Sequence, residues 1–458
     1  MDILQVNTSN VTHGKINIAG FKHALTIIVA AAIGINRKVR IDNVPDVLDT
    51  HVLSKIINLL GGNCVYNGTA LEIESSHLSD SVIPDSLAAL AHGSIYLIPV
   101  LLGRFGRVKF SSFGGCLIGD NNSRPINHIL SVLQKFGADF NVAMDYTEVR
   151  TKELHCCNID IMDYSDVKGD LTGPLVSGAT KTAILAAIFV RRGVTVIKNP
   201  YLKPDVTELL DFLKEAGHVV TVNTSEVIIS HVACDEHYDK PVQFDLISDL
   251  SEIITYLTIS VLSEKKIELL CHKKSKIMSG LAPEISLLSA MGVKIYFSGN
   301  TLSVSVDSRL RHADVIVKST GIYSDHQPFF ALMMCYATDK SLIEEKVWLG
   351  RFSYCSELNK LGANIVREGN KIYITPSQLH AEPMSVNAGD LRAAAVLLLA
   401  AIVRKGKTLI YGASHLSRGY NNLIPNLKSL SVDVHEINIT AENEEKLIND
   451  NEFFRLSN

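Results

Sequence analysis

One unit of sequence recurs along the whole chain, and this repeat restricts the folds that the chain can adopt. Each copy opens with a helix rich in small and aliphatic residues, followed by a basic or glycine-containing turn and a short strand. Residues 177–199 (SGATKTAILAAIFVRRGVTVIKN) and 390–413 (DLRAAAVLLLAAIVRKGKTLIYGA) show this half of the unit most clearly. Looser copies start near Lys22, His92, Asp249 and Asp325.

The second half of each unit is an amphipathic helix that ends at a small residue before another strand. Residues 126–142 (INHILSVLQKFGADFNV) and 206–222 (VTELLDFLKEAGHVVTV) are good examples, and apolar residues recur in the first of them at helical spacing. A polar hairpin and a further strand usually close the unit. The buried helices and the amphipathic helices therefore alternate along the chain.

The repeats group into two domains rather than into a solenoid, whose units would be shorter and would carry distinct caps. We count six units of about 65–80 residues each. Three of them lie in a first domain, residues 22–235, and three lie in a second domain formed by residues 1–21 together with 236–458. The predicted fold class is α/β.

Charged residues stand at the beginnings of the buried helices. Capping explains Asp249 and accounts for part of the role of Asp390, because aspartate accepts hydrogen bonds from the first helical N–H groups. Capping does not explain Lys22 or Arg392, since the helix dipole disfavours a cation at an N-terminus. Parallel helix starts and cations facing one another across a cleft would suit a ligand with phosphate and carboxylate groups.

A glycine-rich loop with one cysteine, FGGCLIGDNNSRP at residues 113–125, allows two interpretations. It is either a surface turn that happens to contain a thiol, or a lid that carries a reactive Cys116 with Arg124 close behind it. The residues of the loop alone favour the first interpretation.

Composition excludes several classes of protein. With 47% hydrophobic residues, 20% charged residues and a net charge of −4, the 458-residue chain has no basic surface for nucleic acid or membrane lipid. Its longest apolar runs are shorter than the roughly 18–20 residues of a membrane span, and its start lacks the pattern of a secretory signal. Eight scattered cysteines show no zinc spacing. We therefore expect a cytoplasmic protein without a metal, a cofactor, a nucleic-acid partner or a membrane partner.

Taken in order, Lys22, the Cys116 loop, Asp325, GRF (350–352), GDLRA (389–393) and SRGY (417–420) resemble the enolpyruvyl transferases. The match is to the branch that acts on UDP-N-acetylglucosamine rather than to the shikimate branch, and it covers all but about the last twenty residues. The resemblance implies an inside-out α/β barrel of two similar domains, built from six βαβαββ units, with the active site in the interdomain cleft. It also implies transfer of the enolpyruvyl group of phosphoenolpyruvate to the 3-hydroxyl of the sugar nucleotide, with release of phosphate, as the committed step of peptidoglycan synthesis.

The resemblance also implies roles for individual residues. Cys116 would be the proton donor, Asp325 the base at the sugar hydroxyl, and Lys22 a further catalytic cation. Substrate-binding roles fall on Arg351, Arg392 and Arg418 around phosphoenolpyruvate, on Arg124, Pro125, Ile126, Asn127 and His128, and on His23, His92, Val176, Ser177 and Val347. The partners are then small molecules, and a monomer is favoured.

Several residues depart from the family pattern. His23 and His92 replace an asparagine and an arginine, Asn127 replaces an aspartate, and Pro174 replaces a lysine, while the loop before Arg124 is about three residues longer than usual. These changes leave open a divergent cell-wall enzyme, either the primary enzyme or a second copy, and an enzyme for another nucleotide or nucleoside acceptor, as in peptidyl-nucleoside antibiotic pathways. A non-catalytic relative is the third possibility, and the retained catalytic residues count against it.

Overall fold

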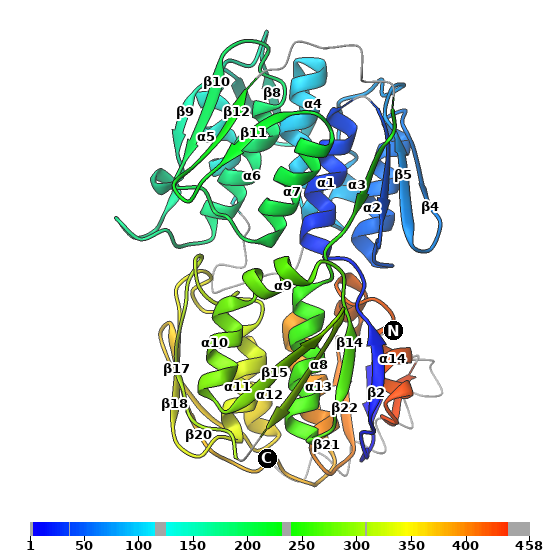
Figure 1. Ribbon diagram of the computed structural model, residues 1–458, viewed down its shortest axis with the longest axis vertical. Coiled ribbons are helices and arrows are strands. Elements are labelled where there is room, and N and C mark those ends of the chain that lie inside the picture. The colour runs from blue at the N-terminus through cyan, green and yellow to red at the C-terminus, as the bar shows by residue number, and fades with distance from the viewer. Residues whose placement is uncertain (1–2, 36, 115–124, 231–239, 307–308, 438–458) are drawn as a thin grey trace.

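The chain folds into two lobes that lie end to end (Figure 1). The computed structural model describes residues 3–35, 37–114, 125–230, 240–306 and 309–437. Two segments of the chain cross between the lobes side by side. The Phe21 N–H donates to the Ile247 carbonyl and the Asp249 N–H donates to the Ala19 carbonyl, each at 2.8 Å. None of the helices in these ranges is long and apolar enough to cross a membrane.

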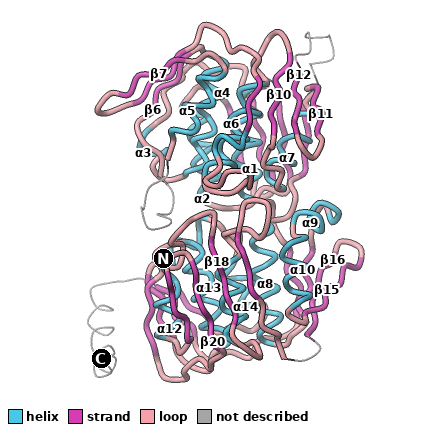
Figure 2. The backbone as a smooth tube through the Cα atoms, turned by 90° about the vertical axis from the view of Figure 1, so that its left-hand side faces the viewer, coloured by secondary structure: helices cyan, strands magenta, loops and turns pink. Residues whose placement is uncertain are grey.

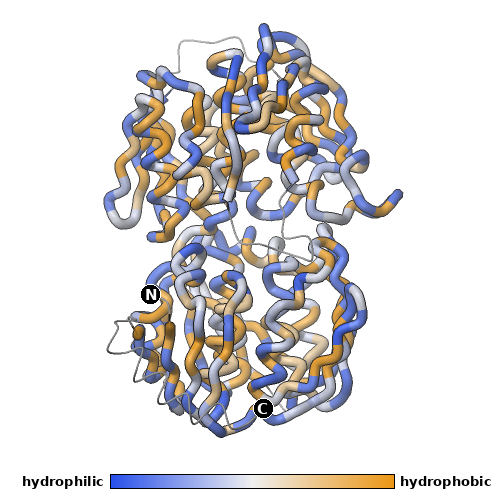
Figure 3. Tube along the Cα trace, turned by 180° about the vertical axis from the view of Figure 1, so that it is seen from behind, coloured by the Kyte–Doolittle hydropathy of each residue, from blue (hydrophilic) through white to orange (hydrophobic). Residues whose placement is uncertain are grey.

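Each lobe is built around three buried helices that contact one another. They are α1 (Lys22–Gly34), α4 (Leu97–Phe105) and α6 (Leu175–Ala187) in the first lobe, and α8 (Leu250–Ser263), α11 (Gln327–Cys335) and α13 (Leu391–Val403) in the second. Figure 3 shows hydrophobic residues along these helices. In α13, for example, every residue from Leu391 to Ile402 is buried, because alanine and leucine surround the whole helix.

Amphipathic helices and short helices complete the helical part of each lobe. The second helices of the repeat units, most of them amphipathic, are α2 (Leu48–Leu59), α5 (Asn127–Lys135), α7 (Pro204–Glu215), α10 (Ala282–Ala290), α12 (Ser353–Lys360) and α14 (Leu423–Ser429). The short ones are α3 (Asp85–Ala88), η1 (His92–Tyr96), η2 (Ile161–Tyr164), α9 (Lys274–Gly280) and η3 (Ala413–Arg418).

Sheets form the outer surface of both lobes (Figure 2). The first lobe holds β13-β3-β5-β4, β6-β8-β7 and β11-β12-β10-β9, and the second holds β15-β16-β14-β2, β17-β18-β20-β19 and β21-β22-β1-β23. Their bounds are β1 (Ile3–Val6), β2 (Gly14–Asn17), β3 (Lys38–Asp42), β4 (Asn63–Tyr66), β5 (Ala70–Glu74), β6 (Arg107–Phe110), β7 (Asp139–Val142), β8 (Thr147–Arg150), β9 (Asn158–Asp160), β10 (Val194–Lys198), β11 (Val219–Val222), β12 (Glu226–Ser230), β13 (Val242–Asp245), β14 (Ile267–Leu270), β15 (Val293–Ser298), β16 (Thr301–Val306), β17 (Asp314–Val317), β18 (Ser341–Glu345), β19 (Asn364–Glu368), β20 (Lys371–Thr375), β21 (Met384–Asn387), β22 (Thr408–Tyr411) and β23 (Val434–Ile437).

The four-stranded sheets repeat one pairing pattern, in which a parallel pair is extended by antiparallel strands, whereas β6-β8-β7 is antiparallel throughout. β17 runs parallel to β18, and β18 is antiparallel to β20, which pairs with β19. β9 and β10 are followed in the same way by β12 and β11. Helices inside and sheets outside confirm the predicted two-domain inside-out α/β fold.

One strand crosses the expected domain boundary. β13 lies after residue 235, yet it pairs in parallel with β3, from Val242↔Val39 to Asp245↔Asp42. The first residues of the chain lie in the second lobe, where β1 pairs with β22 and β2 pairs with β14. The division at residue 235 stays a prediction, and the pairing of β13 with β3 places Val242–Asp245 beside a first-lobe sheet.

Candidate active site

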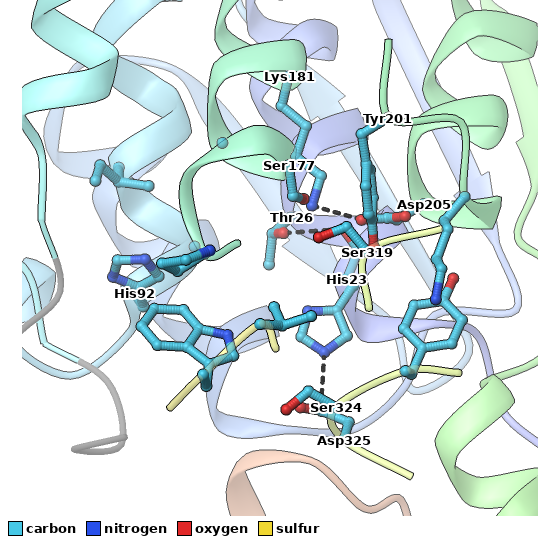
Figure 4. A pocket seen from close by; sticks show the side chains of 18 of the residues that line it. His23, Thr26, His92, Ser177, Lys181, Tyr201, Asp205, Ser319, Ser324 and Asp325 are labelled. Atoms are coloured by element: carbon cyan, nitrogen blue, oxygen red, sulfur yellow. Dashed lines mark hydrogen bonds and ion pairs between the residues drawn. The ribbon is translucent and has the colours of Figure 1, made fainter. Parts of the chain in front are cut away.

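A cavity of about 240 Å³ lies between the lobes, where the starts of the buried helices face one another. Most of the residues expected to bind substrate line it. From the first lobe these are Lys22, His23, His92, Pro125, His128 and Ser177, and from the second lobe they are Asp325, Val347, Arg351, Arg392 and Arg418. Figure 4 shows the side chains of His23, Ser177 and Asp325 around this space.

Asp325 is the centre of an ion cluster on the second-lobe side. Its Oδ1 lies 2.6 Å from Arg351 Nη1, and its Oδ2 lies 2.8 Å from Arg392 Nη2. The Nε2 atom of His23 approaches the same carboxylate from the first lobe at 3.5 Å. Burial alone would raise the pKa of Asp325, but Arg351 and Arg392 hold it well below its usual range. The carboxylate is therefore ionised at neutral pH.

Both arginines are fixed by the protein around them. Arg392 follows the cap of α13, where Asp390 accepts the N–H groups of Arg392 and Ala393. Its guanidinium is buried and also donates to the Tyr420 hydroxyl at 3.1 Å. Arg351 is 6% exposed and donates to the Ser324 hydroxyl at 3.2 Å. Such preorganised cations suit a substrate that carries negative charge.

A buried network supports the turn that carries Asp325. The next residue, His326, contacts the Glu284 carboxylate through Nδ1 at 2.8 Å and the Ser251 hydroxyl through Nε2 at 3.1 Å. The three side chains are 1%, 0% and 2% exposed in the order His326, Glu284 and Ser251, and none of them lines the cavity. The arrangement resembles an acid–histidine–serine triad, but without access to a substrate its effect is to hold the start of α11 in place.

Lys22 and Arg418 join the two lobes at one side of the cavity. Lys22 Nζ donates to the Arg418 carbonyl at 2.6 Å and lies 3.2 Å from the Asp49 carboxylate. Arg418 in turn donates from Nη2 to the Leu90 carbonyl at 3.0 Å. Both cations therefore stand where a ligand between the lobes would meet them.

The first-lobe side of the cavity includes the starts of α5 and α6. His128 is 9% exposed, and burial lowers its pKa to about 4, so its ring is neutral at physiological pH. It packs against Gly178, where an added Cβ would lie 2.2 Å from His128 Nε2. Along this edge, the described residues His128 and Ser177 therefore present neutral hydrogen-bond donors and acceptors rather than cations.

Three of the predicted binding residues are absent from the described lining of the cavity. The Val176 side chain is 0% exposed and belongs to the core, and Ile126 also packs against the core. Asn127 is the first residue of α5 and is exposed. Cys116 and Arg124 lie outside the described residues, so their predicted roles rest on the sequence.

Sequence reasoning missed an ion pair in the wall of the cavity. Lys181 Nζ lies 2.5 Å from the Asp205 carboxylate, and both side chains are almost fully buried (Figure 4). Burial acts to lower the pKa of Lys181, but Asp205 raises it, and Lys181 in turn lowers the pKa of Asp205 against the effect of its burial. A lysine inside the apolar run of α6 was the available signal, because a buried cation needs a partner. Trp348, the single tryptophan of the chain, also lines the cavity.

Comparison with known proteins identifies the family. The model of the family described as EPSP synthase (3-phosphoshikimate 1-carboxyvinyltransferase) matches residues 6–427. The chain belongs to the EPSP synthase family. It is accordingly an enolpyruvyl (1-carboxyvinyl) transferase, and the predicted fold, family and enzyme class are confirmed.

Relatives within the EPSP synthase family extend over nearly the whole chain. The chain is 32% identical to the UDP-N-acetylglucosamine 1-carboxyvinyltransferase of Wolbachia pipientis wMel, covering 92% of this chain and 96% of that protein. It is 29% identical to the enzyme of the same name from Campylobacter hominis, covering 95% and 99%.

Solved structures of other proteins are also similar to the chain. The enolpyruvyl transferase NikO from Streptomyces tendae is 32% identical, with a TM-score of 0.89 over 96% of this chain and 99% of that chain. EPSP synthase from Acinetobacter baumannii, at 12% identity and a TM-score of 0.70 over 95% and 100%, shares the fold.

Proposed function

We propose that the enzyme transfers the enolpyruvyl group of phosphoenolpyruvate to the 3-hydroxyl of UDP-N-acetylglucosamine and releases phosphate. The names of its relatives support this acceptor. The observation that carries the proposal is the carboxylate of Asp325 between Arg351 and Arg392 on the wall of the interlobe cavity. A base for a hydroxyl and cations for an anionic co-substrate stand within one site.

The ion cluster also explains how the base becomes effective. While both guanidinium groups contact Asp325, its lowered pKa makes it a weak proton acceptor. The phosphate and carboxylate of phosphoenolpyruvate would share the positive charge of the fixed Arg351 and Arg392 with Asp325, which raises the pKa of the Asp325 carboxylate. Asp325 would therefore gain basicity when the co-substrate is bound.

The reaction then runs in two steps. The acceptor oxygen bonds to C2 of phosphoenolpyruvate while Asp325 takes its proton and the Cys116 thiol protonates C3, giving a tetrahedral adduct. The Cys116 thiolate then takes a proton back from C3, the C2–O bond to phosphate breaks, and the enol ether forms while the protonated Asp325 gives its proton to the departing phosphate. Lys22, Arg392 and Arg418 would neutralise the phosphate during both steps. The product commits material to peptidoglycan, and the enzyme would act in the cytoplasm as a monomer.

A second acceptor class has a specific observation in its favour. Pro174 is the N-cap residue of α6 and lines the cavity where the family usually has a lysine. Without that ammonium group, and with a neutral His128 nearby, the first-lobe edge offers less to a diphosphate. A nucleoside monophosphate or a nucleoside is the alternative acceptor, in specialised metabolism rather than in the cell wall.

A phosphate-release assay tests both readings. Phosphoenolpyruvate is supplied with UDP-N-acetylglucosamine, with UMP or with uridine, and kcat/KM is compared. We expect UDP-N-acetylglucosamine to give the highest value. A higher value for UMP or uridine would establish the second acceptor class, and no turnover with any of the three would contradict the first proposal.

Two cysteine variants control the assay. Cys116→Ser should lower turnover by about 10²–10⁴, the usual contribution of a positioned proton donor. Cys156→Ser should leave turnover unchanged, because Cys156 is exposed and does not line the cavity. Near-normal activity of Cys116→Ser would show that the loop thiol is not the acid.

A further inference from the structure

A buried lysine links the first lobe to the loop that carries Asp325. Lys203 is the N-cap residue of α7, is 9% exposed and lines the cavity. Its Nζ donates to the Gly321 carbonyl at 2.5 Å and lies 3.6 Å from the centre of the Tyr323 ring. Both contacted residues belong to the second-lobe loop between β17 and α11, shortly before Asp325.

The partners of Lys203 differ from those of most other cations around the cavity. Carboxylates lie within 4.0 Å of Lys22, Lys181, Lys318, Arg351 and Arg392. For Lys203 the described carboxylates include none at that distance, and its recorded contacts are a carbonyl oxygen and an aromatic face. The direct contacts of this cation are therefore with the loop itself, and the nearby carboxylates act on it only from a greater distance.

We propose that Lys203 is a positioning residue that fixes the Asp325 loop against the first lobe. On the second-lobe side, Glu284 already holds this loop, accepting the Tyr323 N–H at 2.9 Å and contacting His326. Lys203 supplies the matching contact from the first lobe. When the lobes are together, the two contacts hold Asp325 in a single position relative to the acceptor hydroxyl. The proposal rests on the role of Asp325 as the base.

The charge of Lys203 gives this contact a pH dependence. Burial lowers the pKa of Lys203 to about 8, although the carboxylates of Glu284, Asp205, Asp325 and Glu345 act to raise it. The phenols of Tyr201 and Tyr323 stay neutral, because burial raises the pKa of each well above its usual value. As pH rises through about 8, the ammonium becomes an amine, which still donates a hydrogen bond but no longer attracts the Tyr323 ring as a cation.

Kinetic profiles of two variants test the proposal. Lys203→Met should lower kcat by about 10- to 100-fold, the effect of a small misplacement of a catalytic group, with little change in the KM for phosphoenolpyruvate. The wild type should lose activity as pH rises through about 8. Lys203→Arg should keep its activity beyond that pH, because a guanidinium stays charged. A loss of activity at alkaline pH that is identical in the wild type, Lys203→Met and Lys203→Arg would come from another titrating group and would overturn the proposal.

A control and a second measurement separate this proposal from the proposed function. Lys276 also joins the lobes, contacting Glu208 at 2.6 Å, but it does not contact the Asp325 loop, so Lys276→Met should keep the wild-type alkaline limb. Hydrogen exchange needs no turnover. Lys203→Met should speed hydrogen exchange in residues 318–326, whichever acceptor the enzyme uses. Lys276→Met should leave exchange in the same residues unchanged. Unchanged exchange in Lys203→Met would refute the contact as a support of the loop, even if the proposed acceptor proved correct.

Discussion

The buried helices of the two lobes begin in different ways. In the second lobe, Asp249 accepts the Ser251 and Glu252 N–H groups at the start of α8, and Asp390 does the same at the start of α13. In the first lobe, the residues preceding α1, η1 and α6 are Phe21, Ala91 and Pro174, and none of these caps its helix through a side chain. Lys22 and His92 are the first residues of α1 and η1.

This difference separates two tasks within one cavity. Aspartate caps neutralise the positive ends of α8 and α13, whereas α11 has no side-chain cap and begins beside the cluster of Asp325, Arg351 and Arg392. In the first lobe the starts of η1 and α6 keep their positive partial charge for a ligand. The second lobe is therefore suited to proton transfer, and the first to holding an anionic acceptor.

Asp249 couples the two patterns. Its Oδ1 caps α8, while its Oδ2 accepts the backbone N–H of Lys22 at 3.2 Å. One carboxylate at the crossing point thus serves a helix of each lobe. Among the described residues, Asp249 is the only one whose carboxylate accepts a backbone N–H at the start of α1, and it belongs to the other lobe.

The largest expected effect is on the second-lobe cluster. Asp325→Asn should lower kcat by about 10²–10⁴, because an amide cannot accept the hydroxyl proton. The KM for phosphoenolpyruvate should not rise, since Arg351 and Arg392 lose the carboxylate that competes with the substrate. Steady-state phosphate release measures both constants. Asp170→Asn, which removes a carboxylate that contacts Lys318 across the lobes at 3.4 Å, is the matched control and should keep kcat.

A loss smaller than threefold in Asp325→Asn would contradict the division of tasks. The base would then have to come from the first lobe, and the cluster would serve only to bind substrate.

A smaller effect is expected at the helix caps. Asp390→Ala should lower the free energy of unfolding by about 0.5–2 kcal/mol, the usual value of a cap, and Asp249→Ala should cost more because it serves two helices. Urea denaturation measures both. Asp249→Asn should recover most of the loss, since asparagine also caps. An equal cost for Asp249→Ala and Asp390→Ala would show that the contact with Lys22 adds no stability.

Features of the fold that depend on local sequence patterns could be predicted from the sequence. The alternation of buried and amphipathic helices predicted the two-lobed α/β fold, because the spacing of apolar residues within a segment determines which type of helix it forms. The helix starts near Lys22, Asp325 and Asp390 also follow from local sequence, and the structure brings these residues to one cavity.

Contacts between distant segments could not be predicted in the same way. Pairing of β13 with β3 joins residues that are far apart in the chain, and no periodicity within either strand specifies the partner. Lys203 precedes a proline at the start of an amphipathic helix, which reads as an ordinary exposed position. Its contacts with Gly321 and Tyr323 depend on how the lobes meet.

The smallest expected effect lies in the first lobe, at His92. If this histidine supplies the charge that an arginine usually supplies, its contribution depends on protonation. Activity at subsaturating substrate should then fall as pH rises through neutrality. His92→Arg should flatten the decline and lower KM at alkaline pH, because a guanidinium remains charged. Identical pH profiles for the wild type and His92→Arg would show that His92 acts as a neutral residue, so that the positive charge of the first lobe would come from Lys22 and the helix ends. Complete loss of activity in His92→Arg would indicate a cavity reshaped around the smaller imidazole ring, which favours an acceptor other than UDP-N-acetylglucosamine.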